Sequence, residues 1–276
     1  QLSCTGGPFE VGAKWGIYKD ILCAGKESVY DFVEDILDEI IPLFPYRHIH
    51  IGGDEAPKDK WKKCPDCQAM MEKHGIKNEK LLQTYFTNRV VKFLKSRNCT
   101  VIGWDEIVTE ALDKDTIVQY WHPTGQDRAV TSMDDGRKCI FSPFRKYYLD
   151  YSCEFMPLRK SYEYDPYIKE LTKEARANIM GVEAPLWTEY VDSEERIYWQ
   201  TFPRLSAVSE TAWTEQGLRN YDNFLARFWQ LQKRLDILDV KYTTWDCYSY
   251  DRRSKPLKML FSKEHSAIAE YNKYKG

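Results

Sequence analysis

Short β-branched segments alternate with helical segments along most of this chain. Strands that alternate with helices form a parallel sheet through right-handed crossovers, so the carboxyl ends of all strands meet at one rim. Each expected strand ends near an aromatic or acidic residue, which would place these side chains together. The pattern predicts an α/β fold with functional groups at one rim, as in (β/α)8 barrels. Five strands are expected, at about 47–52, 100–104, 116–121, 138–142 and 179–183.

The strand end at residues 48–55, HIHIGGDE, is the most informative of these. Ile49 and Ile51 fall on one side of an extended segment and the two histidines on the other. Two glycines then permit a sharp turn and the close approach of a ligand to the backbone. Asp54 and Glu55 therefore follow a strand directly, either as catalytic carboxyl groups or as two solvated acids of a polar turn.

Amphipathic helices are expected between the strands. Apolar side chains at helical spacing indicate helices at 29–43 and 79–97, and later at 193–213 and 220–238, with a short helix at 125–135. Residues 1–28 and 56–77 are expected to be mainly loop, with one short helix in the second. A loop of about 35 residues, rich in tyrosine, follows the fourth strand, and loops of that length are usually functional.

Composition narrows the class of partner. The 276 residues are 43% hydrophobic and carry a net charge of −2, so nothing indicates a nucleic-acid partner or an anionic membrane surface. No apolar run reaches the roughly 18 residues that a membrane-spanning helix needs. Nine tryptophans and nineteen tyrosines are many for this length, and aromatic faces suit the binding of sugar rings, although most must pack in the core.

The cysteine pattern does not define a metal site. Among eight cysteines there is a single C-x-x-C, formed by Cys64 and Cys67. A structural zinc site needs four ligands, and no second C-x-x-C exists. His74 could be a third ligand, but a fourth is not apparent. We therefore expect no metal, and either a disulfide or plain thiols at this pair.

The segment 48–55 resembles the His-x-Gly-Gly-Asp-Glu signature of the glycoside hydrolase family 20 β-N-acetylhexosaminidases. Further resemblances, extending to about residue 240, follow in the family's order. They are Gly103-Trp104-Asp105-Glu106, Tyr120-Trp121, Tyr148-Leu149-Asp150 and Leu186-Trp187-Thr188-Glu189.

The resemblance implies a (β/α)8 TIM barrel, of which this chain would hold about strands four to eight. Residues 1–245 would form the carboxyl-terminal portion of the catalytic barrel, and residues 246–276 an extension whose structure the sequence does not define. Any sugar-binding side chain on the first three strands would then lie outside this sequence.

The family resemblance also implies a reaction, the retaining exo-hydrolysis of terminal N-acetylglucosamine or N-acetylgalactosamine. Glu55 would be the general acid. Asp54 would hold the N–H of the substrate's 2-acetamido group, whose oxygen attacks the anomeric carbon in the substrate-assisted mechanism of this family. Neighbouring side chains diverge, which suits this division of roles better than a direct acid and nucleophile pair. No cofactor is implied.

Three tryptophans, Trp104, Trp121 and Trp187, each follow a strand. In the family, tryptophans at matching positions form the walls of the pocket for the N-acetyl methyl group and the sugar face. Burial of that methyl group by indole rings is favourable and excludes water from the reacting oxygen. The alternative for each tryptophan is packing at the barrel rim.

The resemblance assigns the remaining binding groups as well. Tyr148 would donate its hydroxyl to the acetamido oxygen; Tyr147 is an alternative, and the Tyr-x-Asp spacing favours Tyr148. Asp150 and Glu189 match acids that accept hydrogen bonds from sugar hydroxyls. His50 is an even number of residues from Asp54, so both side chains would fall on the same side of an extended segment, and His50 would orient Asp54. This role is compatible with a buried histidine whose hydrogen bonds are made by its neighbours.

Two other functions remain open at this point. One is a conventional two-carboxylate glycosidase that uses Asp54 or Glu55 together with Asp105 or Glu106. The second acid pair lacks the preceding Gly-Gly, so we favour a helix N-terminus for it. The other is a non-catalytic sugar-binding module, since three barrel strands would be absent.

The expected partners are glycans that contain N-acetylhexosamine. Five strands leave two sheet edges, which would limit solubility or allow a homo-oligomer by edge pairing. A secreted, periplasmic or otherwise extracytoplasmic location is expected, although the 276 residues themselves show no signal peptide. In such a location Cys4 and Cys23, which bracket an irregular segment, would form a disulfide. Closing this loop would stabilise the fold by about 3 kcal/mol.

Overall fold

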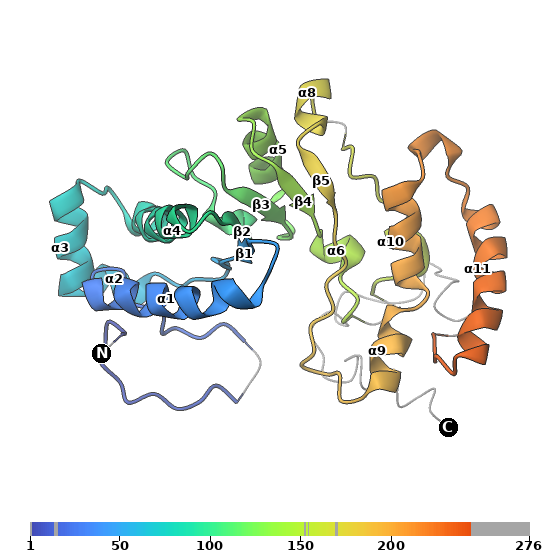
Figure 1. Cartoon of the computed structure of the whole chain (residues 1–276), viewed down its shortest axis with the longest axis horizontal. Helices are drawn as coiled ribbons and strands as arrows, with labels where there is room; N and C mark the ends of the chain where they lie inside the picture. Colours follow the sequence, from blue (N-terminus) through green and yellow to red (C-terminus); the bar gives the residue numbers. More distant parts are fainter. Residues whose placement is uncertain (1, 14–15, 152, 154, 169–170, 244–276) are drawn as a thin grey trace. The chain divides into compact units, whose positions relative to one another are not determined.

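The computed structural model describes residues 2–13, 16–151, 153, 155–168 and 171–243. Its strands form one parallel sheet in chain order, as the sequence predicts (Figure 1). Each strand lies within its predicted range, and β1 pairs with β2 so that His48 is opposite Thr100. The strands are β1 (His48–His50), β2 (Thr100–Trp104), β3 (Ile117–Tyr120), β4 (Cys139–Phe141) and β5 (Ile179–Val182).

The chain divides into two compact units. The first comprises residues 1–140 and 171–180, and the second residues 141–170 and 181–276. The first unit contains the helices α1 (Glu27–Ile40), α2 (Asp59–Lys63), α3 (Pro65–His74), α4 (Glu79–Ser96), α5 (Gln126–Asp134) and α8 (Lys173–Arg176), with the 3-10 turns η1 (Ile41–Leu43) and η2 (Asp105–Ile107).

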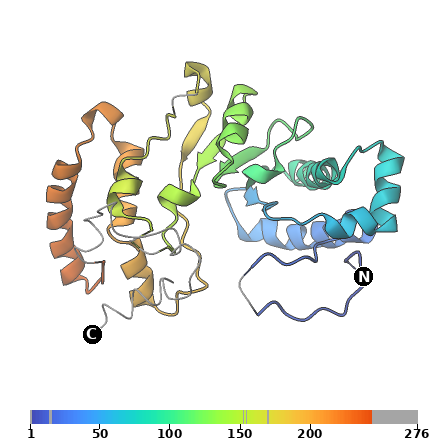
Figure 2. The ribbon, with the colours of Figure 1, turned by 180° about the vertical axis from the view of Figure 1, so that it is seen from behind.

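Helix α4 organises the first unit. The Asn78 side chain caps it by accepting a hydrogen bond from the Leu81 amide, which satisfies one of the free N–H groups of the first turn. The helix runs beside α1 (Figures 1 and 2) and packs on the strands. Burial of these apolar faces forms the core behind β1 and β2, which includes Ile41, Ile49, Val90, Val91, Leu94 and Val101.

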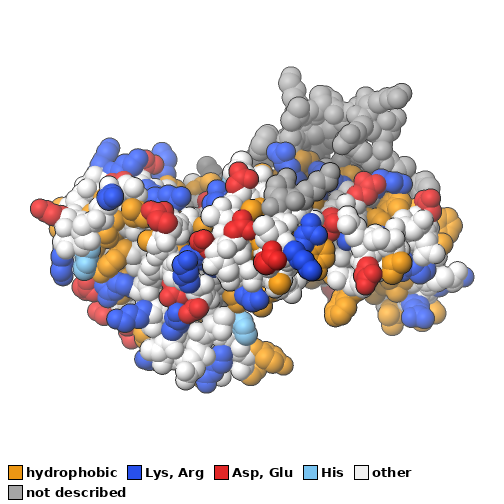
Figure 3. All heavy atoms as spheres, turned by 90° about the horizontal axis from the view of Figure 1, so that it is seen from above, with side chains coloured by type: hydrophobic (Ala, Val, Ile, Leu, Met, Phe, Trp, Pro, Cys, Tyr) orange, Lys and Arg blue, Asp and Glu red, His pale blue; other side chains and the backbone are white. Residues whose placement is uncertain are grey.

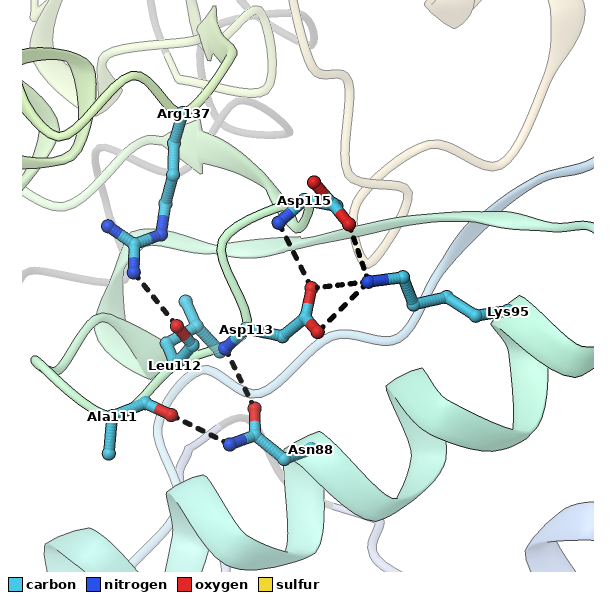
Figure 4. Close-up of polar contacts among 7 residues, drawn as sticks. All are labelled: Asn88, Lys95, Ala111, Leu112, Asp113, Asp115 and Arg137. Carbon is cyan, nitrogen blue, oxygen red and sulfur yellow. Dashed lines mark hydrogen bonds and ion pairs between the residues drawn. The ribbon is translucent and has the colours of Figure 1, made fainter.

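A polar network ties α4 to the connection between β2 and β3 (Figure 4). Asn88 accepts a hydrogen bond of 2.9 Å from the Asp113 amide, and Lys95 forms an ion pair of 3.0 Å with the Asp113 carboxylate. The buried Arg137 donates to the Leu112 carbonyl at 2.8 Å. The segment that leads into β3 is therefore fixed to both α4 and the segment before β4.

The second unit contains α6 (Phe144–Tyr147), α7 (Leu158–Tyr162), α9 (Glu194–Thr201), α10 (Arg204–Trp213), η3 (Gln216–Leu218) and α11 (Tyr221–Ile237). Helix α10 packs against α7 and α11. The core between these helices is largely aromatic and includes Leu158, Tyr162, Ala207, Phe224 and Phe228.

Three helix predictions are wrong in detail. The predicted helix at 193–213 is two helices, because Pro203 has no N–H to donate and its ring cannot follow a helical turn. Residues 56–77 hold two helices where one was expected. The second begins with Pro65 and ends at Gly75 with φ 63°, the usual start and stop residues. The long loop after β4 contains α6, α7 and α8.

Lys and Arg side chains are interspersed with Asp and Glu on the face drawn in Figure 3. None of the helices in the described part of the chain is long and apolar enough to cross a membrane. The extension predicted at 246–276 lies outside the described residues.

Candidate active site

The turn after β1 requires both of its glycines. Gly52 and Gly53 adopt φ values of 68° and 99°, a region that disfavours side chains. The Gly52 carbonyl accepts a hydrogen bond of 3.0 Å from the Trp104 amide, which continues the pairing with β2. A Cβ on Gly53 would lie 2.2 Å from Ile107 Cγ2. The turn therefore packs directly on η2 and brings the next two residues to the strand end.

Glu55 is held in an unusual backbone conformation at this turn. Its φ of 45° is left-handed, which costs a non-glycine residue about 1–2 kcal/mol. Its amide donates a 3.3 Å hydrogen bond to Glu106 Oε2, and the preceding Gly53 carbonyl accepts one of 2.7 Å from Gln83. These contacts from η2 and α4 hold the acid pair in a defined geometry despite the backbone strain.

The surroundings of Glu55 favour its protonated form. Partial burial raises the pKa of this carboxyl group above its ordinary value, and the negative charges of Asp54 and Glu106 raise the pKa further. His122 acts in the opposite direction. A carboxyl group whose pKa is raised in this way is better suited to serve as a general acid.

A cavity of about 440 Å³ lies beside Glu55, within the first unit. A cavity of this size can accept a sugar-sized ligand. Glu106 contributes a second carboxylate to its wall, and Oε1 of that group is buried without a hydrogen-bond partner among the described residues. The lining also includes Ile17, Lys58, Lys80 and Gln83.

Asp105 has a structural role. Its side chain is completely buried, and Oδ1 accepts hydrogen bonds from the amides of Trp121 and His122 at 2.9 and 3.1 Å. Arg128 donates to Oδ2 through Nε and Nη2 at 3.0 and 2.6 Å. The carboxylate is thus committed to holding the ends of β2 and β3 together, which removes it as a partner acid for Asp54 or Glu55.

Aromatic rings line up across the ends of the first three strands. The His50 and Trp104 rings lie 4.8 Å apart, and the Trp104 and Trp121 rings 6.1 Å apart, both edge to face. Trp104 is nearly buried. His50 Nδ1 accepts a 3.0 Å hydrogen bond from the Gly52 amide, so a neutral ring carries its proton on Nε2. His50 therefore supports the glycine turn that precedes Asp54.

In the second unit, Tyr148 and Trp187 lie side by side. Their ring centroids are 6.5 Å apart, and the Leu149 amide donates a 2.7 Å hydrogen bond to the Pro185 carbonyl, which joins the two segments. Tyr148 is buried, whereas 44% of Trp187 is exposed. The predicted Tyr-x-Asp segment thus packs against the predicted Trp-Thr-Glu segment.

Asp150 is a partly buried acid beside this pair. Its pKa is raised to about 7, chiefly by desolvation and also by the charge of Glu189, while backbone amides and Arg204 oppose the shift. Its Oδ1 has no hydrogen-bond partner among the described residues. Arg204 and Gln200 instead bind the carbonyls of Leu149 and Asp150, which fixes the segment. Glu189 is exposed.

Sequence reasoning did not identify four residues around these acids. Glu106 was considered only as a rival catalytic acid, although it binds the Glu55 amide. Lys58 and Lys80 in the cavity wall, and Arg128 on Asp105, carried no signal. Glu106, Lys80 and Arg128 are distant in sequence from the acids they lie near, and Lys58 is one of several lysines in a polar connection, so only the three-dimensional arrangement places them at the site.

Comparison with known proteins gives consistent results. The sequence model of the glycosyl hydrolase family 20 catalytic domain matches residues 3–216. A β-hexosaminidase of Porphyromonas gingivalis is 36% identical over 254 residues, which cover 88% of this chain and 32% of that protein. The chain therefore spans about a third of the length of that relative.

Solved structures are similar as well. The exo-β-N-acetylglucosaminidase of Vibrio harveyi in complex with N-acetylglucosamine superposes with a TM-score of 0.75 at 30% identity, covering 82% of this chain and 37% of that one. The β-N-acetylhexosaminidase of Bacteroides fragilis gives a TM-score of 0.76 at 26% identity, covering 92% of this chain and 53% of that one.

Proposed function

Because this chain belongs to glycosyl hydrolase family 20, we propose that the protein is a retaining exo-β-N-acetylhexosaminidase. Its five-stranded parallel sheet is part of the (β/α)8 barrel of this family. The substrates are glycans with a terminal N-acetylglucosamine or N-acetylgalactosamine. The reaction is substrate-assisted: the acetamido oxygen of the sugar attacks its own anomeric carbon, and water later opens the cyclic intermediate.

The observation that carries this proposal is the environment of the Asp54-Glu55 pair. Two glycines and the Glu106 carboxylate fix the pair at a strand end, and burial with two nearby negative charges raises the pKa of Glu55. Glu55 then donates a proton to the leaving oxygen. Asp54 remains an acceptor for the acetamido N–H, which aligns the acetamido oxygen for attack.

The ion pair of Asp105 with Arg128 supports the substrate-assisted mechanism over that of a conventional two-carboxylate glycosidase. A two-carboxylate glycosidase needs a second acid that is free to act as nucleophile or base. Asp105 is buried and accepts hydrogen bonds on both oxygens. This excludes Asp105 as the second acid. Glu106 accepts a hydrogen bond from the Glu55 amide, and in this proposal it supports Glu55 while the acetamido group of the substrate is the nucleophile.

The remaining site residues bind the sugar in this proposal. Trp104, Trp121 and Trp187 contact the N-acetyl methyl group and the sugar face through their indole rings. Tyr148 donates its hydroxyl to the acetamido oxygen. Asp150 and Glu189 accept hydrogen bonds from the hydroxyl groups of the sugar, and these bonds are strongest where the carboxyl groups are ionised. His50 supports Asp54 through the glycine turn.

One comparison of substrates tests the proposal. The protein should hydrolyse an aryl N-acetyl-β-glucosaminide and leave the matching aryl β-glucoside, which lacks the acetamido nucleophile, almost intact. Equal hydrolysis of both would indicate a conventional glycosidase, and binding without hydrolysis of either would indicate a sugar-binding module. The same proposal includes an extracytoplasmic location, where such glycans are found.

Glu106→Gln is expected to shift the pH profile without removing activity. Glutamine retains the oxygen that accepts the Glu55 amide, but it removes one of the two negative charges that raise the Glu55 pKa. Since Glu55 must be protonated to act, activity falls as pH rises through its pKa. The alkaline limb of kcat/KM should therefore move to lower pH, measured on a substrate with a poor leaving group.

If the alkaline limb of kcat/KM stays in place or moves to higher pH in Glu106→Gln, Glu106 does not raise the pKa of Glu55. Asp54 and His122, the other charged or titratable groups that affect Glu55, are unchanged in this variant. Glu110→Gln, which replaces an exposed acid in the same connection, provides the control.

Asp150→Asn is expected to weaken substrate binding and flatten the pH dependence of stability. The Asp150 pKa rises from 3.8 to about 7 in the fold. The resulting stabilisation of the fold is complete below the pKa of Asp150 in the unfolded chain, and it is lost as pH rises through about 7, the pKa in the folded protein. Asparagine cannot ionise, so the melting temperature of the variant should vary less between pH 4 and 7 than that of the wild type. Above pH 7, where Asp150 is ionised, loss of this charged acceptor should raise KM about 10-fold or more.

Thermal denaturation across this pH range and steady-state kinetics measure the two effects of Asp150→Asn separately. Asp192→Asn, at an exposed position of the same unit, should retain the wild-type pH dependence. An Asp150→Asn variant with the wild-type profile would mean that Asp150 ionises normally in the fold.

A further inference from the structure

Four cysteines from distant parts of the sequence meet in the first unit. The sulfurs of Cys4, Cys23, Cys64 and Cys67 all lie within 4.8 Å of one another. Three of the Sγ–Sγ distances are 3.8 Å for Cys4 and Cys67, 3.7 Å for Cys23 and Cys64, and 3.6 Å for Cys23 and Cys67. All four are free thiols in the structure.

These distances fit one metal ion. Zn²⁺ binds thiolates tetrahedrally at about 2.3 Å, and the edge of such a tetrahedron is about 3.8 Å. A disulfide would instead require about 2.05 Å between two sulfurs. We propose that Cys4, Cys23, Cys64 and Cys67 form a structural Zn²⁺ site with four thiolate ligands.

The local fold brings the two ligand pairs together. Ser3 and Leu22 form an antiparallel bridge, and the Cys23 amide donates a 2.9 Å hydrogen bond to the Leu2 carbonyl. Cys4 and Cys23 thus lie on two adjacent extended segments. The other pair flanks the start of α3, with Cys64 as the residue before the helix and Cys67 in its first turn.

Gly25 shows how closely the two pairs approach. A Cβ at this position would lie 2.2 Å from the carbonyl carbon of Asp66 and 2.4 Å from the Cys67 nitrogen. These are backbone atoms, so no side-chain movement could relieve the overlap. The absence of a side chain at Gly25 therefore allows the Cys23 segment to pack directly on the Cys64–Cys67 turn.

The site is closed, as structural zinc sites are. Cys23, Cys64 and Cys67 are buried and Cys4 is half-buried. They belong to an apolar cluster with Trp61, Met70 and Leu82, among others. Such a site has no open position for water or substrate, which excludes a catalytic role for the metal. A purely structural role follows.

One cation, Lys26, contacts residues next to the ligands. Four thiolates around Zn²⁺ carry a net charge of −2. The Lys26 ammonium donates a 2.9 Å hydrogen bond to the Ser3 carbonyl and lies 3.9 Å from Asp66. Both contacts hold its charge next to residues that adjoin the ligands. Outer contacts of this kind are typical of metal sites and help to fix the ligands.

The cluster corrects two expectations from the sequence. The predicted Cys4–Cys23 disulfide is wrong, since both residues are free. The fourth ligand that was not apparent for the C-x-x-C pair is supplied by these same two cysteines. His74, considered as a third ligand, instead lies 3.2 Å from the Tyr85 hydroxyl.

The site would support the candidate active site from a distance. Cys4 and Cys23 are the two ends of a loop that contributes Ile17 to the wall of the cavity beside Glu55. Trp61 of α2 donates a 3.0 Å hydrogen bond to the Leu22 carbonyl, which fastens the same loop to the segment that follows Glu55. Bound zinc would join the loop between Cys4 and Cys23 to the Cys64–Cys67 turn that follows α2.

Metal analysis of the protein, purified without a metal-affinity step, tests the proposal. We expect about one zinc per chain, with a Zn–S distance of about 2.3 Å by X-ray absorption. Replacement by Co²⁺ should give the intense visible bands of a tetrahedral site and a sulfur-to-metal charge-transfer band. Protein with free thiols that neither contains nor takes up a metal would overturn the proposal. So would a mass lower by four hydrogens, which would indicate two disulfides.

Variants locate the ligands. Cys67→Ser should lose most of the bound zinc and melt at a lower temperature, because metal binding adds directly to folding stability. Cys99→Ser alters a buried cysteine outside the cluster and should retain the full metal content. Equal zinc in both variants would contradict the assignment. If Cys67→Ser does not fold, the cobalt spectrum and zinc content of the wild type still decide the question.

Discussion

Glu55→Gln is expected to slow the hydrolysis of a natural N-acetylglucosamine disaccharide by about 10²–10⁴-fold, the usual contribution of general acid catalysis. Much of the activity on an activated aryl glycoside should remain. The leaving group of the aryl substrate is a weak base that departs without a proton, whereas the sugar alcohol needs one. The structure supports this role because burial and the charges of Asp54 and Glu106 raise the Glu55 pKa.

Steady-state kinetics of both substrates with wild type, Glu55→Gln and Glu110→Gln measure the difference. Glu110 is exposed and its replacement should leave both rates near the wild-type values. If Glu55→Gln slows both substrates by the same factor, the residue does something other than protonate the leaving group. The pH profile offers a second criterion, since the alkaline limb on the disaccharide should disappear in Glu55→Gln.

The strands and the acids at their ends could be predicted because their signals are local. Alternation in residues 48–51 and the two glycines that follow determine the turn at Asp54 without information from elsewhere. The same holds for helix α4, where apolar spacing and the Asn78 cap agree. Family resemblance added the expected roles of Trp104 and Tyr148, which spacing alone could not assign.

Features that depend on contacts between distant segments were missed. The sequence left Asp105 as a rival catalytic acid or, as favoured, part of a helix N-terminus, and neither reading anticipated its ion pair with Arg128 on another helix. The cysteine cluster is the clearest example. Cys4 and Cys67 are separated by 63 positions, and their approach depends on a two-stranded bridge and on the space left by Gly25. No short motif encodes such an arrangement.

Asp54→Asn is expected to slow the disaccharide and the activated aryl glycoside together, by about 10²-fold or more, the scale of losing alignment of a reacting group. Asp54 acts on the acetamido group, whose oxygen displaces the leaving group as it bonds to the anomeric carbon, so this contribution applies to either leaving group. Asparagine has nearly the same size, but it cannot offer a negatively charged acceptor to the acetamido N–H. Asp59→Asn, at an exposed acid five residues along the chain, is the matched control.

Binding of a thiazoline that mimics the cyclic intermediate gives Asp54→Asn a readout apart from turnover. Wild type should bind the mimic tightly and Asp54→Asn weakly, because the enzyme is complementary to the transition state and to species that resemble it. Glu55→Gln should bind it nearly as well as wild type, since the mimic has no leaving group to protonate. A covalent glycosyl-enzyme on Asp54, trapped with a fluorinated substrate and found by mass spectrometry, would make Asp54 a direct nucleophile. The acetamido group would then have no part in the first step.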